Sequence, residues 1–126
     1  MKVLVDTSVW IDYFRGGNDS GHLDFLIDEN LLVTNDLILT ELIPFLRIRN
    51  QKKIINLLYH INQLVLSVNW NQIIDYQYKC LKNGLNGVGI PDLLIAQNAK
   101  HNNCEIYSLD NHFYLMKDIL SLQIKA

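Results

Sequence analysis

Residues 1–14 have the sequence MKVLVDTSVWIDYF, and this stretch holds the pattern on which the fold prediction rests. Three apolar residues, 3–5, run directly into Asp6, and residues 8–14 have apolar side chains at helical spacing. A short apolar run without clean alternation is typical of a strand covered on both faces, as in a parallel sheet. The stretch therefore predicts a strand, an acidic turn and a helix, with Asp6 either capping that helix or serving as the first ligand of a site.

The same order of elements repeats along the chain. Short apolar runs predict strands at residues 3–5, 31–33, 64–68 and 106–109, with 122–124 as a further candidate. Helical spacing predicts helices at residues 8–14, 23–28, 36–47, 52–60, 71–81, 92–100 and 111–116. Alternation of this kind predicts the α/β class, as a three-layer α/β/α sandwich with a mostly parallel central sheet.

Length and composition are those of a compact chain. The 126 residues are enough to bury one core, and 49% hydrophobic against 19% charged residues is typical of a globular protein, so we expect a single domain over residues 1–126. The apolar runs are too short to span a bilayer and the N-terminus does not follow the order of a secretory signal. We therefore expect no membrane association and a cytoplasmic location.

The cysteines and histidines give no support for a soft metal site. The two cysteines are far apart, and the four histidines are scattered without the spacing of ligand pairs. The histidines are therefore interpreted as surface or half-buried residues. The net charge of −2 does not by itself indicate a nucleic-acid binder, although gathering several acids in one pocket would leave the remaining surface slightly basic.

Three aspartates stand next to predicted elements. Asp6 and Asp110 directly follow the predicted strands 3–5 and 106–109, so both would emerge at the carboxyl edge of the sheet, where ligands collect in such folds. Asp92 follows a proline and precedes the helix 92–100. Each of the three could equally be a helix cap.

Glu41 is harder to explain as a surface residue. It lies within LILTELIPFL, residues 37–46, where most neighbours are candidates for the core. An unpaired buried carboxylate costs several kcal/mol, so Glu41 either shares a narrow polar stripe with Asp36 and Thr40 or lies in a polar pocket. Pro44 makes its direction less certain, because a proline within a helix removes a hydrogen bond and kinks or restarts the helix.

A metal ion would allow these acids to lie together. Carboxylates about 4 Å apart repel by roughly 4 kcal/mol per pair at an effective dielectric constant near ~20, so a cluster needs protons or a cation. Oxygen ligands favour Mg²⁺, with Mn²⁺ as the alternative, and Mg²⁺ held by a few carboxylates commonly binds substrate phosphates. This donor set is typical of metal-assisted phosphoryl chemistry.

Four segments resemble a known family in their order and spacing. They are VDTSVWIDYF, TEL, GIPDLLIAQNA and YSLDNHF. The pattern is similar to that of PIN-domain endoribonucleases, and most of all to VapC-type toxins of bacterial toxin–antitoxin pairs, over nearly the whole chain. The resemblance implies a PIN-like fold and a metal-dependent endoribonuclease that is the toxin of a type II pair. The acids that match the family's catalytic and metal-binding quartet are Asp6, Glu41, Asp92 and Asp110.

The resemblance has further implications for the site and its partners. Thr7 and Ser8 match the hydroxyl pair after the first acid, and Ser108 matches a hydroxyl position beside the fourth. The family also implies homodimers, a cognate antitoxin whose C-terminal segment covers the site, and RNA substrates, with tRNA and rRNA as candidates. Arg15, at the end of the first predicted helix, is a candidate phosphate contact, or else complements the helix C-terminus. The basic segment RIRNQKK, residues 47–53, is either a pair of solvated helix ends or a track for the RNA backbone.

Other classes of protein fit less well. A haloacid-dehalogenase-like phosphatase needs a second aspartate two residues after the first, where this chain has Ser8. A receiver domain needs a lysine after a late strand, and residues 108–112 contain none. Two alternatives stay open: a catalytically silent PIN-like module that binds RNA or an antitoxin, and a DNA-directed structure-specific nuclease.

Overall fold

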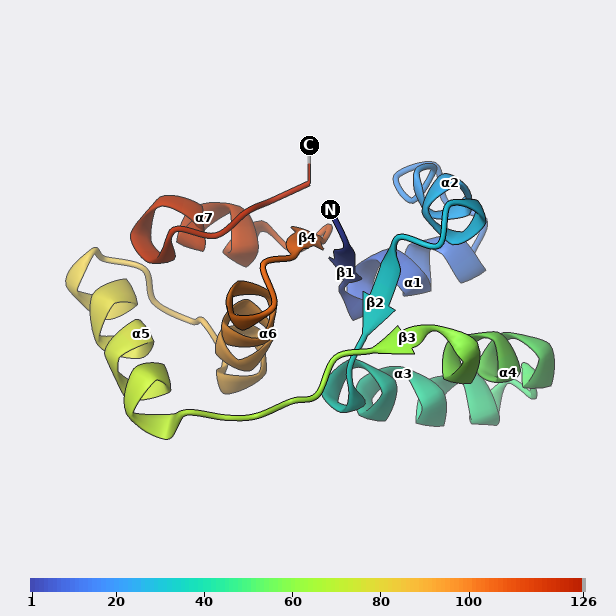
Figure 1. Ribbon diagram of the computed structural model, residues 1–126, viewed down its shortest axis with the longest axis horizontal. Coiled ribbons are helices and arrows are strands. Elements are labelled where there is room, and N and C mark those ends of the chain that lie inside the picture. The colour runs from blue at the N-terminus through green and yellow to red at the C-terminus, as the bar shows by residue number, and fades with distance from the viewer. Residues whose placement is uncertain (126) are drawn as a thin grey trace.

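The computed structural model describes residues 1–125, and within this range the chain forms four strands and seven helices (Figure 1). The strands are β1 (Val3–Val5), β2 (Leu32–Thr34), β3 (Asn62–Gln63) and β4 (Glu105–Tyr107). The helices are α1 (Thr7–Phe14), α2 (Leu23–Asp28), α3 (Asp36–Ile48), α4 (Lys52–His60), α5 (Trp70–Lys82), α6 (Ile90–His101) and α7 (Asn111–Leu120). The strands pair in parallel in the order β3-β2-β1-β4, which confirms the predicted α/β class and parallel sheet.

Helices cover both faces of this sheet. Helices α1, α3 and α4 pack together on one side, and α5, α6 and α7 pack together on the other (Figure 1). The arrangement is the predicted three-layer sandwich. The longest helices, α3 and α5, have 13 residues each, and no helix in the described range has the length and apolar character needed to cross a bilayer.

The core explains the apolar runs of the sequence. All three residues of β1 are buried, because β1 is paired on both edges and covered on both faces. Trp10 from α1 and Phe113 from α7 pack against the sheet and are each 1% exposed. Burial of a large apolar side chain contributes about 1.5–3 kcal/mol relative to its exposure, so these two residues anchor the helices that begin at the strand ends.

The predicted strand over residues 64–68 is wrong. The ladder of β3 ends where the Leu64 amide donates to the carbonyl oxygen of Thr34 at 2.8 Å, and residues 64–69 form an irregular connection to α5. Its half-buried and exposed residues do alternate as in a strand, but side chains of α6 satisfy its backbone. Asn98 Nδ2 donates to the Val65 carbonyl oxygen at 3.0 Å, in place of a ladder partner.

Two other expectations need adjustment. The candidate strand at 122–124 is reduced to a single parallel bridge between Ile106 and Ile124. Pro44 does not end its helix, since α3 continues without interruption to Ile48. The direction of Glu41, three residues earlier, is therefore set by a regular helix rather than by a new start.

Candidate active site

Asp6 both caps a helix and lies at the carboxyl edge of β1. Its side chain is the N-cap of α1, and it is only 7% exposed. Its Oδ2 accepts hydrogen bonds from Ser8 Oγ at 2.7 Å and from Ser108 Oγ at 2.9 Å. The two interpretations of Asp6 are thus compatible, because the second carboxylate oxygen is left free of these bonds.

The same two serines tie the start of α1 to the turn after β4. Ser8 Oγ accepts a hydrogen bond from the Leu109 amide at 3.0 Å, and Ser108 Oγ accepts one from the Asp110 amide at 2.9 Å. Each hydroxyl donates to Asp6 and accepts from this turn. The pair therefore fixes the Asp6 carboxylate relative to Asp110, which lies in the turn between β4 and α7.

Glu41 approaches this group from α3. It is an exposed residue, and its Oε1 accepts a hydrogen bond from Thr7 Oγ1 at 3.3 Å. Partial burial of the carboxyl group raises the pKa of Glu41, and the Thr7 bond opposes that rise. The negative charges of Asp6 and Asp92 raise the pKa further, so Glu41 faces the aspartates rather than a separate polar stripe.

Asp92 does not cap its helix. Gly89 is the N-cap of α6, and Asp92 lies in the first turn, so the capping explanation is wrong for this residue. Burial raises the pKa of the Asp92 carboxyl, followed by the charges of Asp110 and then Asp6, while His112 opposes the rise. Asp92 thus interacts with acids that come from two other elements.

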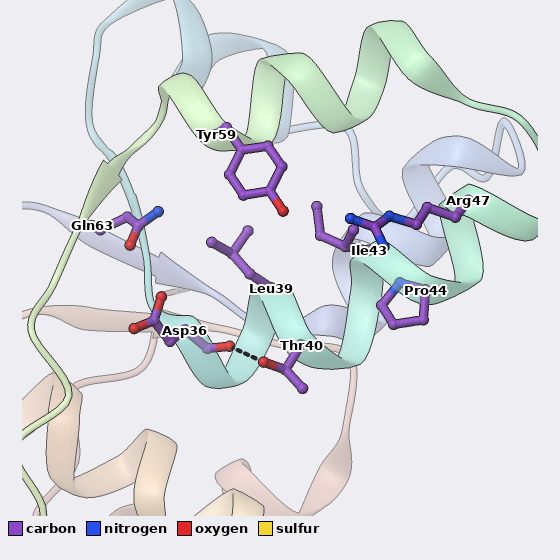
Figure 2. Close-up of a pocket in the computed structure, with 8 residues that line it drawn as sticks. All are labelled: Asp36, Leu39, Thr40, Ile43, Pro44, Arg47, Tyr59 and Gln63. Atoms are coloured by element: carbon purple, nitrogen blue, oxygen red, sulfur yellow. Dashed lines mark hydrogen bonds between the residues drawn. The ribbon is translucent and has the colours of Figure 1, made fainter.

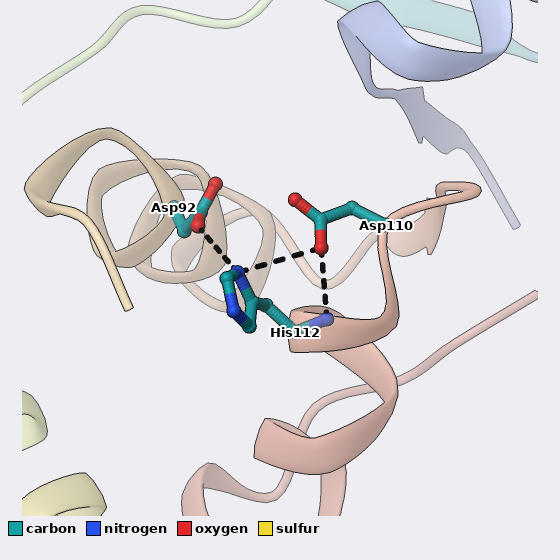
Figure 3. A group of neighbouring side chains, drawn as sticks. All are labelled: Asp92, Asp110 and His112. Atoms are coloured by element: carbon teal, nitrogen blue, oxygen red, sulfur yellow. Dashed lines mark hydrogen bonds and ion pairs between the residues drawn. The ribbon is translucent and has the colours of Figure 1, made fainter. Parts of the chain in front are cut away.

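Asp110 and His112 complete the cluster from the start of α7. Asp110 is the N-cap of α7, and its Oδ1 accepts a hydrogen bond from the His112 amide at 2.9 Å. His112 Nδ1 lies 3.4 Å from Asp92 Oδ2 and 3.4 Å from Asp110 Oδ1. Figure 3 shows the imidazole between the two carboxylates, and the three residues offer ligand atoms that all lie within 4.8 Å of one another.

His112 is the site residue that the sequence analysis missed. Its side chain is 35% exposed, which agrees with a half-buried histidine, yet its Nδ1 faces the acids. The sequence feature that could have identified His112 is its position two residues after Asp110, the aspartate that follows the last strand. A single histidine whose partners are carboxylates far away in the sequence forms no histidine pair at ligand spacing, so the sequence shows no metal-site pattern at this position.

The four acids therefore form one electrostatic cluster at the carboxyl edge of the sheet. Within residues 1–125, no lysine or arginine forms an ion pair with any of them, and the imidazole of His112 lies 3.4 Å from Asp92 and from Asp110. The neighbouring aspartates raise the pKa of Glu41 and of Asp92, and a group of carboxylates without a lysine or arginine partner among the described residues fits a divalent cation. Asp6, Glu41, Asp92 and Asp110 are brought together as the sequence predicts, and their roles as ligands stay predictions.

Arg15 lies away from this cluster. It is the C-cap residue of α1, whereas Asp6 caps the N-terminus, and eight helical residues span about 12 Å at about 1.5 Å each. Arg15 lines a small pocket with Phe45 and Arg49. A contact between Arg15 and a substrate phosphate stays a prediction, and it would involve a part of the substrate remote from the acids.

A second pocket lies between α3, α4 and β3 and has a volume of about 360 Å³. Figure 2 shows the residues that line it: Asp36, Leu39, Thr40, Ile43, Pro44, Arg47, Tyr59 and Gln63. None of the four clustered acids is among them. The pocket therefore belongs to another face of α3 and takes no part in the acidic site.

The fold and the site define an α/β protein with a carboxylate cluster at the edge of a parallel sheet. The family model of the PIN domain matches residues 3–119, and the chain belongs to this family. A comparison with curated proteins gave no match.

Three solved structures are similar to the chain in fold. A chain of VapBC2 from Rickettsia felis, bound to a DNA fragment from its promoter, has a TM-score of 0.77 and 21% identity, covering 99% of this chain and 98% of that one. DNA-bound VapBC from Salmonella typhimurium has a TM-score of 0.76 and 18% identity, with coverages of 99% and 97%. A toxin–antitoxin complex from Klebsiella pneumoniae has a TM-score of 0.65 and 16% identity, with coverages of 89% and 90%.

Proposed function

We propose that the protein is a metal-dependent endoribonuclease of the PIN type and the toxin of a type II toxin–antitoxin pair. The observation that carries this proposal is the convergence of Asp6, Glu41, Asp92 and Asp110 without a lysine or arginine partner. Membership of the PIN family and the likeness in fold to VapBC complexes support it.

In this proposal Asp6 and Asp92 bind a metal ion directly. Glu41 completes the shell, directly or through water, and Asp110 places a water molecule or a second ion. Mg²⁺, or Mn²⁺, would supply an activated water and stabilise the charge that gathers on the phosphate oxygens. Ser8 and Ser108 hold the Asp6 carboxylate in a fixed direction.

Thr7 plays a similar part for Glu41. Its hydroxyl donates to Oε1 and leaves the other carboxylate oxygen free of this bond. Hydrogen bonds that orient metal-binding carboxylates typically change metal affinity or activity by about 10–100-fold. The three hydroxyl residues are thus expected to act through the acids rather than on the substrate.

We propose that the protein acts in the cytoplasm and that its substrate is RNA, with tRNA and rRNA as first candidates. The basic residues of segment 47–53 are exposed at the end of α3 and the start of α4, where they are accessible to a phosphate backbone. Neutralising phosphates releases counterions and gives salt-dependent affinity. Arg15 would contribute one further phosphate contact.

We propose two protein partners, an antitoxin and a second copy of the chain. The likeness to complexes of toxins with antitoxins supports the first. For the second, α5 presents an apolar face in which Trp70, Ile74 and Tyr78 are 59%, 67% and 58% exposed. These residues recur every four positions, so they share one side of the helix, and exposed apolar patches of this kind mark interaction surfaces.

Cleavage of labelled tRNA, rRNA and single-stranded DNA by the purified protein tests the enzymatic proposal. Reactions contain Mg²⁺, Mn²⁺ or EDTA, and Asp6→Asn is the matched control, because asparagine keeps the capping role of Asp6. We expect discrete RNA fragments that require both a metal and Asp6. Equal cleavage of DNA would favour the DNA-directed alternative. No fragments in any metal, with antitoxin shown to be absent, would favour the silent binding module.

A further inference from the structure

His112 Nδ1 is poorly placed for a hydrogen bond but well placed between two carboxylates. The atom is buried and has no hydrogen-bond partner among the described residues. Its distance to Asp92 Oδ2 and to Asp110 Oδ1 is 3.4 Å in both cases, whereas a good N–H···O bond measures about 2.7–3.2 Å. The nitrogen thus faces both oxygens without being paired closely to either (Figure 3).

We infer that His112 binds the metal ion through Nδ1, together with Asp92 and Asp110, and that this nitrogen makes the site prefer Mn²⁺ to Mg²⁺. The inference rests on the proposed metal-dependent function. Two ligands at right angles on an octahedral ion, each about 2.1 Å from it, lie about 3.0 Å apart. The separations of 3.4 Å are within a few tenths of an ångström of that value.

The preference follows from the type of donor. Mg²⁺ is a hard ion that takes oxygen ligands and gives up its waters reluctantly. First-row transition ions accept imidazole nitrogen more readily, and Mn²⁺ also suits carboxylates. A site with the Asp92 and Asp110 oxygens and one nitrogen therefore binds Mn²⁺ more tightly than an all-oxygen site would. The nitrogen does not increase the affinity for Mg²⁺.

A different role for His112 predicts the opposite result. If its imidazolium pairs with Asp92 and Asp110 as a counter-ion, it occupies the place of the metal and competes with it. Removing it would then tighten the binding of both ions. The sign of the change in affinity therefore distinguishes a ligand from a competitor.

The experiment compares the dissociation constants of Mn²⁺ and Mg²⁺, measured by calorimetry, for the wild type and His112→Asn. We expect Mn²⁺ binding to weaken by about tenfold or more, as for other lost contacts at metal sites, and Mg²⁺ binding to change by less than about threefold. His60→Asn is the matched control, because His60 is exposed on α4 and bonds only to the Asn56 carbonyl oxygen at 2.7 Å. It should leave both constants unchanged.

Pulsed electron paramagnetic resonance of the Mn²⁺-loaded wild type gives a second readout that needs no variant. A directly bound imidazole produces nitrogen modulation of the manganese signal, and this modulation should disappear in His112→Asn and persist in His60→Asn. An Mn²⁺-loaded wild type that cleaves RNA but shows no nitrogen modulation would overturn the inference and leave the proposed function standing. Tighter binding of both ions by His112→Asn would also overturn it. A wild type that binds neither ion would overturn both proposals.

Discussion

Asn35 Nδ2 donates a 2.8 Å hydrogen bond to Asn98 Oδ1, and this bond joins the start of α3 to α6. Both side chains are buried, at 0% and 4% exposed, and Asn35 also caps α3 by accepting from the Ile38 amide at 2.9 Å. Asn35 lies six residues before Glu41, and Asn98 lies six residues after Asp92. The pair thus links the two helices that bring Glu41 and Asp92 to the site.

Replacing Asn98 should test whether the Asn35–Asn98 hydrogen bond positions the metal site in addition to stabilising the fold. Asn98→Ala leaves the buried Asn35 Nδ2 without its acceptor, which costs about 1–3 kcal/mol, removes the bond to the Val65 carbonyl oxygen, and lets α3 and α6 move apart. Gln97→Ala is the control, because Gln97 is 2% exposed on the same helix but bonds only to Asn69 and Gln72. We expect both variants to lower the melting temperature and only Asn98→Ala to weaken Mn²⁺ binding. Equal losses of Mn²⁺ affinity would contradict the prediction.

Glu41→Gln should stabilise the metal-free protein at neutral pH. The pKa of Glu41 in the folded protein is raised above its ordinary value of 4.5, first by burial. For an acid with a raised pKa, the favourable contribution to folding is fully present below the unfolded pKa and is lost as pH rises through the folded pKa. The advantage of the variant over the wild type should therefore grow from about pH 4 upward, as measured by thermal unfolding in EDTA. Glu29→Gln, at the exposed end of α2, is the control. If the stability difference between Glu41→Gln and the wild type did not vary with pH, the raised pKa of Glu41 would be refuted.

Ser108→Ala should reduce cleavage without removing any acid. It deletes a donor to Asp6 and an acceptor for the Asp110 amide, so both carboxylates lose their fixed direction. We expect a fall of about 10–100-fold in the rate at saturating metal, with partial recovery in Ser108→Thr. Ser67→Ala, on the exposed connection between β3 and α5, should have the wild-type rate. A Ser108→Ala enzyme of full activity would show that the hydroxyl is dispensable.

The basic segment 47–53 should contribute to RNA affinity through charge alone. Replacing Lys52 and Lys53 with glutamine removes two cations, and each lost phosphate contact should flatten the slope of log affinity against log salt by about 0.7 for single-stranded RNA. Filter binding at several salt concentrations measures this slope, with Asp6→Asn as the background so that the RNA stays intact. Lys79→Gln is the control, because Lys79 pairs with Asp75 at 3.1 Å on α5. An unchanged slope would assign the segment to solvated helix ends.

The apolar face of α5 should control the oligomeric state. Ile74 is 67% exposed at the centre of that face, and a charge there would have to be buried on association. We expect a dimer for the wild type and a monomer for Ile74→Glu in sedimentation velocity, with equal melting temperatures at low concentration. Tyr114→Glu, at an exposed position of α7, should remain dimeric. A monomeric wild type would remove the proposed homodimer without affecting the nuclease.

The approach of Asp6 to Asp110 could be predicted from the topology of the sheet alone, whereas Glu41 and Asp92 lie within helices and are matched to the site through the family resemblance. β1 and β4 are parallel neighbours, so the chain segments that leave their carboxyl ends reach the same edge of the sheet, and these segments contain Asp6 and Asp110. The connection at 64–69 could not be foreseen, because its backbone partners on α6 lie about thirty residues further along the chain. The alternation of exposed and half-buried residues indicates burial, but it does not show which groups form hydrogen bonds with the backbone amides and carbonyls. The extent of the domain over residues 1–126 stays a prediction.

The connection at 64–69 also has a consequence for synthesis. It carries the chain from the helical layer of α1, α3 and α4 to that of α5, α6 and α7, so Asp6 and Glu41 belong to the first half of the chain, and Asp92 and Asp110 belong to the second. Chains fold from the N-terminus as they leave the ribosome. A growing chain therefore holds two of the four acids until α6 emerges with Asp92, and it gains the fourth, Asp110, only at the start of α7. The proposed metal site, which needs all four acids, therefore cannot form before α7 has folded onto the sheet.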